Sequence, residues 1–183
     1  MMHWRAETCD VPKRATAPRI KIWNVRSFTI RCNDMDQRVK SLKTVADCQA
    51  FARNAKELNR IDLANQARER TIELNALTHG AESNVEREGW EALYAYEEYL
   101  SARNGKKTRA NRTRDLIKRR KIVPAIEQMV VNGTVDTDGF AMLLEAGLLD
   151  YSFESTILRH PESFSANAAT VARERLSQFQ DPE

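Results

Sequence analysis

The chain has 183 residues, of which 42% are apolar, 7% aromatic and 30% charged, and its formal net charge is +3. This length and composition suit one domain with a core, or one domain plus an arm, and a helical protein better than a β-sandwich. No apolar run approaches the roughly 20 residues that span a bilayer, and no secretory-type stretch opens the sequence, so we expect a cytoplasmic protein without a membrane partner.

The three cysteines are widely spaced and form no CxxC pair. Disulfide frameworks and zinc sites need closer clusters, so this spacing argues against both. No metal or other cofactor is expected.

Charge is strongly segregated along the chain. Residues 103–121 carry ten basic and one acidic side chain, a net charge of +9, whereas residues 122–183 carry three and ten, a net charge of −7. Segregation of this kind says little about the fold, but it indicates which partners a protein attracts.

Residues 1–34 differ from the rest of the chain. Pro12, Pro18 and scattered basic side chains indicate an arm, and residues 20–22 and 28–32 alternate apolar and polar side chains with the period of a strand. We expect 1–34 to be a basic arm or extension, either flexible or holding a short β element. A single helical domain is expected over 35–183.

The first helices form a predicted hairpin over residues 44–78. Thr44 provides an N-cap hydroxyl for one helix, Asp62 is the expected cap of the next, and Gly80 is placed to end it. Apolar side chains recur at helical spacing in both segments, which favours two antiparallel helices.

Further start and stop signals divide the remainder of the chain into helices. Ser83 and Glu86 form a capping box, and Asn104-Gly105 is a terminator for the long helix that follows. Thr108 is the expected cap of a helix that runs to about Arg120. Shorter helices are predicted near residues 124–131, 139–146, 151–159 and 165–179, and Ser165 is the expected cap of the last one. The fold class is therefore all-α, a compact domain of about seven or eight helices.

The helix at about 109–120 is the most specific candidate site. Its wheel places Ala110, Thr113, Leu116 and Ile117 on a narrow apolar stripe and basic side chains opposite. A helix of this kind can dock on a core and still present cations to the phosphates of DNA or RNA. The predicted nucleic-acid contacts are Lys106, Lys107, Arg109, Arg112, Arg114, Lys118 and Arg119.

Other interpretations of this helix remain open. Its cations are either a solvated surface or partners for the acidic 122–183 segment, and membrane binding ranks low because the apolar stripe lacks aromatics. The following segment, 125–131, is mostly apolar, which argues against a helix-turn-helix reader. We expect phosphate contacts with weak sequence preference.

The long helix raises a second hypothesis. Trp90 and Tyr94 lie four residues apart, off the arc of core side chains, so they form either a second packing surface or an exposed pair for a protein partner. A helical interaction module, or an inhibitor subunit acting on a nucleic-acid-processing machine, is the alternative function.

Catalysis is the least favoured class of function. Glu86, Glu88, Glu91, Glu97 and Glu98 share the long helix, but the wheel sets most of them on its polar face. His79 and His160 fall at helix ends, where capping or surface roles are expected. No known catalytic motif is present, so we expect no catalytic residues, with an unfamiliar metal-dependent nuclease as the remaining alternative.

Overall fold

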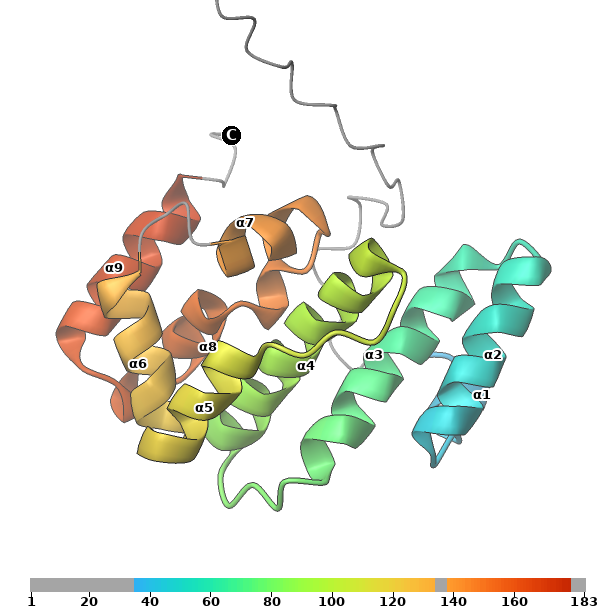
Figure 1. Ribbon diagram of the computed structural model, residues 1–183, viewed down its shortest axis with the longest axis horizontal. Helices are drawn as coiled ribbons and strands as arrows, with labels where there is room; N and C mark the ends of the chain where they lie inside the picture. Colours follow the sequence, from blue (N-terminus) through green and yellow to red (C-terminus); the bar gives the residue numbers. More distant parts are fainter. Residues whose placement is uncertain (1–34, 134–137, 179–183) are drawn as a thin grey trace, which may run out of the picture.

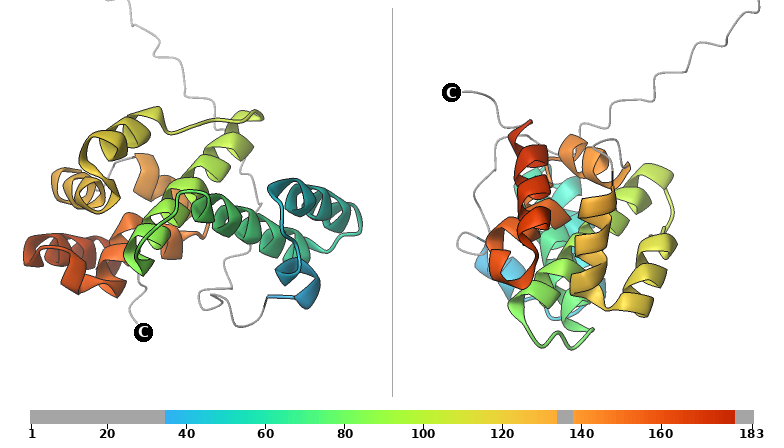
Figure 2. Two further views of the ribbon diagram at one scale, coloured as in Figure 1. Left: turned by 90° about the horizontal axis from the view of Figure 1, so that it is seen from below. Right: turned by 90° about the vertical axis from the view of Figure 1, so that its left-hand side faces the viewer.

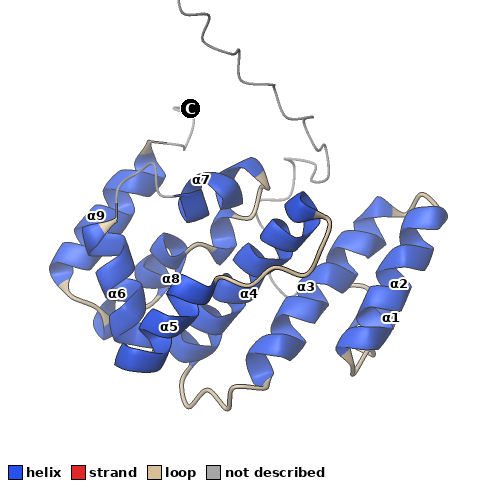
Figure 3. Cartoon of the chain, viewed as in Figure 1, coloured by secondary structure: helices blue, strands red, loops and turns tan. Residues whose placement is uncertain are grey.

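Helices make up all the regular structure in the part of the chain that the structure describes, residues 35–133 and 138–178. Over those ranges this computed structural model has nine α-helices, two 3-10 helices and no strand, as Figure 3 shows. The all-α prediction is confirmed, and the short α1 is additional to the seven or eight helices expected. The elements are α1 (Gln37–Lys40), α2 (Val45–Glu57), α3 (Ile61–Leu77), α4 (Asn84–Asn104), α5 (Asn111–Arg120), α6 (Ile122–Asn132), α7 (Asp138–Glu145), η1 (Leu149–Tyr151), α8 (Phe153–Arg159), η2 (Pro161–Ser163) and α9 (Ala166–Ser177).

The predicted arm at residues 1–34 lies outside the described residues, so its strand and the proposed domain division stay predictions. Within the described ranges, no helix is both long enough and apolar enough to cross a lipid bilayer.

Short-range signals fix most helix ends. The side chains of Thr44, Ser83 and Ser165 each accept a hydrogen bond from the backbone amide three residues later, as predicted. Gly105 ends α4 in the left-handed conformation, with φ at +65°, where a side chain would be strained. These ends set the length of α4 and the point at which the basic segment begins.

Two predicted caps are wrong. The helix α3 begins one residue before Asp62, whose carboxylate forms an ion pair with Arg60 at 2.9 Å instead of capping the helix. Thr108 lies three residues before α5. Its backbone N donates to Ser101 Oγ at 2.9 Å, and its hydroxyl oxygen accepts from Asn104 Nδ2 at 3.1 Å. These contacts tie Thr108 to the end of α4 rather than to the start of α5.

The long helix α4 occupies the centre of the molecule (Figure 1). The predicted α2–α3 hairpin is confirmed and packs on α4 through α3, while α6, α7 and α8 also contact α4 and α9 covers α6 and α8. Figure 1 and the left panel of Figure 2 place α2 and α9 at opposite ends. The largest apolar core joins α4, α5, α6, α8 and α9 around the fully buried Leu93, Ile126 and Ile157.

Two backbone features position α5. At Gly89, where α4 meets α6, an added Cβ would lie only 2.7 Å from Ile126 Cδ1 and 3.0 Å from Ile122 Cγ1. The missing side chain therefore permits the close contact between these helices. Lys121 alone separates α5 from α6, with φ +66° and ψ 168°, a conformation that L residues rarely adopt. The direction of α5 thus follows from that of α6.

Candidate nucleic-acid interface

Residues 105–121 leave the end of α4 as a loop and continue as α5 along the side of the molecule (Figure 1). The apolar stripe of α5 faces inward as predicted: Ala110 and Ile117 are buried in the largest core, and Leu116 packs against it. The opposite face of α5 is therefore directed to solvent.

Glu97 of α4 is the anchor for α5. Its Oε1 accepts hydrogen bonds from the Ala110 backbone N at 2.9 Å and from Arg114 Nε at 2.6 Å, and its Oε2 accepts one from Arg114 Nη2 at 2.7 Å. Glu97 is only 7% exposed, so the forked contact is largely shielded from water. These hydrogen bonds raise the pKa of Arg114 well above its usual value. Arg114 thus faces α4 and fastens α5 to it.

The other six predicted contacts are exposed and form what we call the basic ridge: Lys106, Lys107, Arg109, Arg112, Lys118 and Arg119. Among the described residues, none of the six forms an ion pair with an acidic group, those of the acidic C-terminal third included. Arg119 Nε donates to the backbone oxygen of Asp115 at 3.2 Å. The ridge is therefore a cationic surface whose charges are not neutralised within the described part of the chain.

Position on the helix adds a local role for two of these charges and for the neighbouring Arg120. Lys118, Arg119 and Arg120 occupy the last turn of α5, where cations stabilise the helix dipole. This stabilisation is compatible with phosphate binding, because neither effect removes the charge from solvent. Arg120 is exposed as well.

Trp90 and Tyr94, the predicted partner-binding pair, take part in contacts within the molecule. The Trp90 ring stacks on His79 with centroids 3.6 Å apart and planes 5° apart, and Tyr94 Oη lies 2.8 Å from His79 Nε2. The Arg114 guanidinium lies over the Tyr94 ring, 5.1 Å from its centroid. Both aromatic side chains are half-buried. Their role toward a protein partner stays a prediction.

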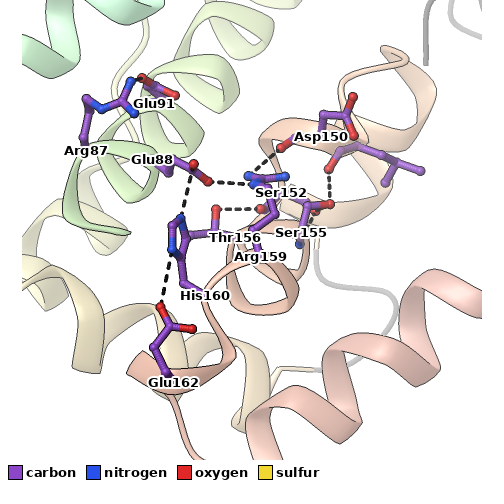
Figure 4. Close-up of polar contacts among 11 residues, drawn as sticks. Arg87, Glu88, Glu91, Asp150, Ser152, Ser155, Thr156, Arg159, His160 and Glu162 are labelled. Carbon is purple, nitrogen blue, oxygen red and sulfur yellow. Dashed lines mark hydrogen bonds and ion pairs between the residues drawn. The ribbon is translucent and has the colours of Figure 1, made fainter. Parts of the chain in front are cut away.

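The acidic side chains of α4 differ from the expected solvated face. Glu91 and Glu97 are buried, and the Glu88 side chain is 12% exposed. Arg87 Nη1 donates to Glu91 Oε1 at 3.1 Å, and Arg159 Nε donates to Glu88 Oε2 at 2.7 Å (Figure 4). For Glu88 and Glu97 the prediction was wrong because a helical wheel gives the angular position of a side chain but not the charge that another helix brings to it. For Glu91 the partner, Arg87, lies on α4 itself, and the wheel does not show how deeply the pair is buried.

His160 belongs to the same contacts. Its Nε2 lies 3.2 Å from Glu88 Oε1, and its Nδ1 lies 3.7 Å from Glu162 Oε1 (Figure 4). His160 is the C-cap of α8, as expected for a histidine at a helix end, but it is mostly buried rather than on the surface. This cluster joins α4 to the end of α8.

Possible metal ligands among the described residues are not clustered. These residues contain no group of three or more histidine, cysteine or acidic side chains placed to hold a metal ion. No protein-family model, curated protein or solved structure matches the chain.

Proposed function

We propose that this protein binds nucleic acid through the basic ridge, contacting phosphates with little preference for base sequence. The observation that supports the proposal is the presentation of six exposed cations on a segment anchored by Glu97, without ion pairs to described acidic residues. Cations at this density repel one another. A polyanion removes that repulsion and releases its own condensed counterions on binding.

Weak sequence preference follows from the helix that succeeds the ridge. A helix-turn-helix protein reads bases with its second helix, which must expose polar side chains. In α6, by contrast, Ile122, Ala125, Ile126 and Val130 are buried in the core. The side chains that α5 still offers to a ligand are Arg and Lys, which bind phosphate oxygens. We propose that the phosphates are those of DNA or RNA in the cytoplasm.

The first test is fluorescence anisotropy of labelled duplex DNA, single-stranded DNA and RNA at several salt concentrations. About five or six phosphate contacts to a duplex predict a log–log salt slope near −5. In a variant with Lys107, Arg112, Lys118 and Arg119 each replaced by Gln, the slope should fall to about −2 and the affinity should drop steeply.

A matched control removes the same charge elsewhere. Lys40, Lys43, Arg53 and Lys56 are exposed on or beside α1 and α2, at the end of the molecule away from α5 (Figure 1). Their replacement by Gln should leave the affinity and slope close to those of the unchanged protein. Equal losses in both variants would mean that net charge alone drives binding. No binding at low salt would reject the proposal.

A helical protein-binding module, including an inhibitor subunit, is the second candidate. Leu58 and Ile61 favour it, because they are 76% and 42% exposed at the turn of the α2–α3 hairpin. Exposed large apolar side chains can mark a contact with another protein. This candidate predicts no binding to bare nucleic acid at low salt.

A further inference from the structure

His79, in the turn after α3, is the outer member of a stack of two rings. Its imidazole lies parallel to the Trp90 ring of α4, with centroids 3.6 Å apart and planes 5° apart. Trp90 in turn packs against the largest core, whereas His79 is exposed. Trp90 therefore covers one face of the imidazole, and the opposite face is turned to the outside.

The outer face of the His79 ring has no partner within the described part of the chain. The Tyr94 hydroxyl meets an edge of the ring, with Oη 2.8 Å from Nε2. Among the described residues, no other ring, hydrogen-bond partner or ion pair reaches the His79 side chain. Parallel offset stacking is a favourable arrangement of flat rings, so this face can receive a third one.

The basic helix runs alongside the part of α4 that holds the stack. The two helices are antiparallel, because Arg114 contacts Glu97 whereas Ile122, just beyond α5, packs at Gly89. Later positions of α5 therefore lie beside earlier positions of α4.

Lys118 brings a charge of the basic ridge to the side of the stack. The Arg114 guanidinium lies over the Tyr94 ring, and Lys118 follows Arg114 by one helical turn on the same face of α5. This step along α5 leads from the level of Tyr94 towards that of Trp90. Lys118 is exposed, and its charge forms no ion pair within the described residues.

We propose that one unpaired base of a bound strand stacks on the outer face of His79, while Lys118 contacts a neighbouring phosphate. This inference rests on the proposed function and narrows its substrate to nucleic acid with unpaired nucleotides. Aromatic side chains, histidine included, stack on splayed bases in proteins that bind single strands, and every base has a flat face. An aromatic side chain of a protein partner offers the same flat face, but it lacks the negative charge that the ridge attracts.

The test compares two labelled single strands of equal length, one with bases and one built entirely from abasic sugar phosphates. Both carry the same phosphates and should show the same salt slope. In the unchanged protein, stacking should make the normal strand bind on the order of tenfold more tightly. His79→Leu covers Trp90 with a side chain that has no flat ring, so most of this difference should disappear. His79→Phe keeps a ring and should retain the difference.

Lys118→Gln tests the neighbouring phosphate. It should weaken the binding of both strands by the same factor and lower the log–log salt slope by about 0.7, the contribution of one phosphate in a single strand. An unchanged slope would overturn the placement of a phosphate at Lys118.

The His79 variants separate stacking from other causes. Urea unfolding verifies that both fold, and His79→Met, which also lacks a ring, takes the place of His79→Leu if that variant does not. Equal affinities of the unchanged protein for the two strands would overturn the inference and leave phosphate binding intact. A difference that persists in His79→Leu would place the base elsewhere, and one that is lost in His79→Phe would show that the ring face is not what binds. No binding of either strand at low salt would overturn the proposed function as well.

Discussion

His79 occupies an unusual position for a histidine at the end of a helix. Its ring stacks on Trp90 and forms a hydrogen bond with Tyr94. The positively charged guanidinium of Arg114 lies over the Tyr94 ring. Burial against these rings lowers the pKa of His79 below its ordinary value of 6.5, and Arg114 lowers it further, while Glu97 acts in the opposite direction. The neutral imidazole is therefore the form that the fold prefers.

This preference predicts a pH dependence of stability. Between the unfolded pKa of about 6.5 and the lower folded pKa, the unfolded chain binds a proton that the folded chain does not. The free energy of unfolding should therefore fall as the pH drops below about 6.5. His79→Phe retains a ring for stacking and cannot titrate, so its stability should fall less steeply between pH 7 and 5. Urea unfolding at several pH values measures both curves, and parallel curves would contradict the assignment.

Single residues were the hardest features to predict from sequence. Trp90 and Tyr94 could be paired because they lie on one helix, but the third ring of the stack comes from the end of α3. Arg114 looks like its basic neighbours on a wheel, and only its 2.6 Å contact with Glu97, 17 positions earlier, sets it apart. Contacts between elements leave no periodic trace in a sequence.

Gly89 offers a test at the scale of the helices. Alanine favours a helix over glycine by about 1 kcal/mol, so Gly89→Ala would stabilise an isolated α4. Here the added Cβ meets Ile126 Cδ1 at 2.7 Å in the core, and such overpacking typically costs about 1–3 kcal/mol. We expect a net loss of up to about 2 kcal/mol, measured by chemical denaturation.

Ile126→Val supplies the control, because it removes the Cδ1 atom that the new methyl group meets. The loss in the double variant should be smaller than the sum of the two single losses. Additive losses would show that the contact between α4 and α6 at Gly89 is loose.

Helices themselves were largely predictable, because caps and apolar spacing are local. All eight predicted helical segments appear, and the caps at Thr44, Ser83 and Ser165 form the expected hydrogen bonds. The errors at Asp62 and Thr108 have one cause: each side chain has a nearby partner outside the helix that it was expected to cap, Arg60 for Asp62 and Asn104 for Thr108.

Arg175 connects three helices, α6, α8 and α9, through its guanidinium group. From α9, its guanidinium donates to Glu154 Oε1 of α8 at 2.9 Å, to the Val130 carbonyl at the end of α6 at 2.6 Å, and to the Gly133 carbonyl at 2.5 Å. Arg175 and Glu154 are each 5% exposed. Burial raises the pKa of Glu154 despite the neighbouring arginine.

Loss of this arginine should destabilise the entire fold. Arg175→Met keeps roughly the length of the side chain but leaves the buried Glu154 carboxylate and the Val130 and Gly133 carbonyl groups without their hydrogen-bond donor. Breaking a buried ion pair costs about 3–5 kcal/mol. Equilibrium urea unfolding should show an earlier midpoint with an unchanged m value. Glu154→Leu in the same chain should recover part of the loss. A midpoint within error of the unchanged protein would show that the pair contributes little.

The arrangement of the helices in space could not be predicted from the sequence, although the charge pattern suggested which segments would pair. Net charges of +9 and −7 on consecutive segments suggested mutual pairing. In the fold, the acidic partner of α5 is Glu97 of α4, which precedes both segments. Pairings of this kind depend on how distant elements pack, and that follows from the shape of the shared core.

The single residue between α5 and α6 has a consequence for how this protein tolerates changes in length. Each added residue turns a helix by about 100°. An insertion next to Lys121 would turn α5 relative to α6. The basic ridge would then face away from solvent, and Ile117 would leave the core. The loop before α5 can instead absorb an extra residue without changing which face of the helix looks outward. Related chains should therefore vary in length ahead of the basic helix and hold a constant spacing behind it.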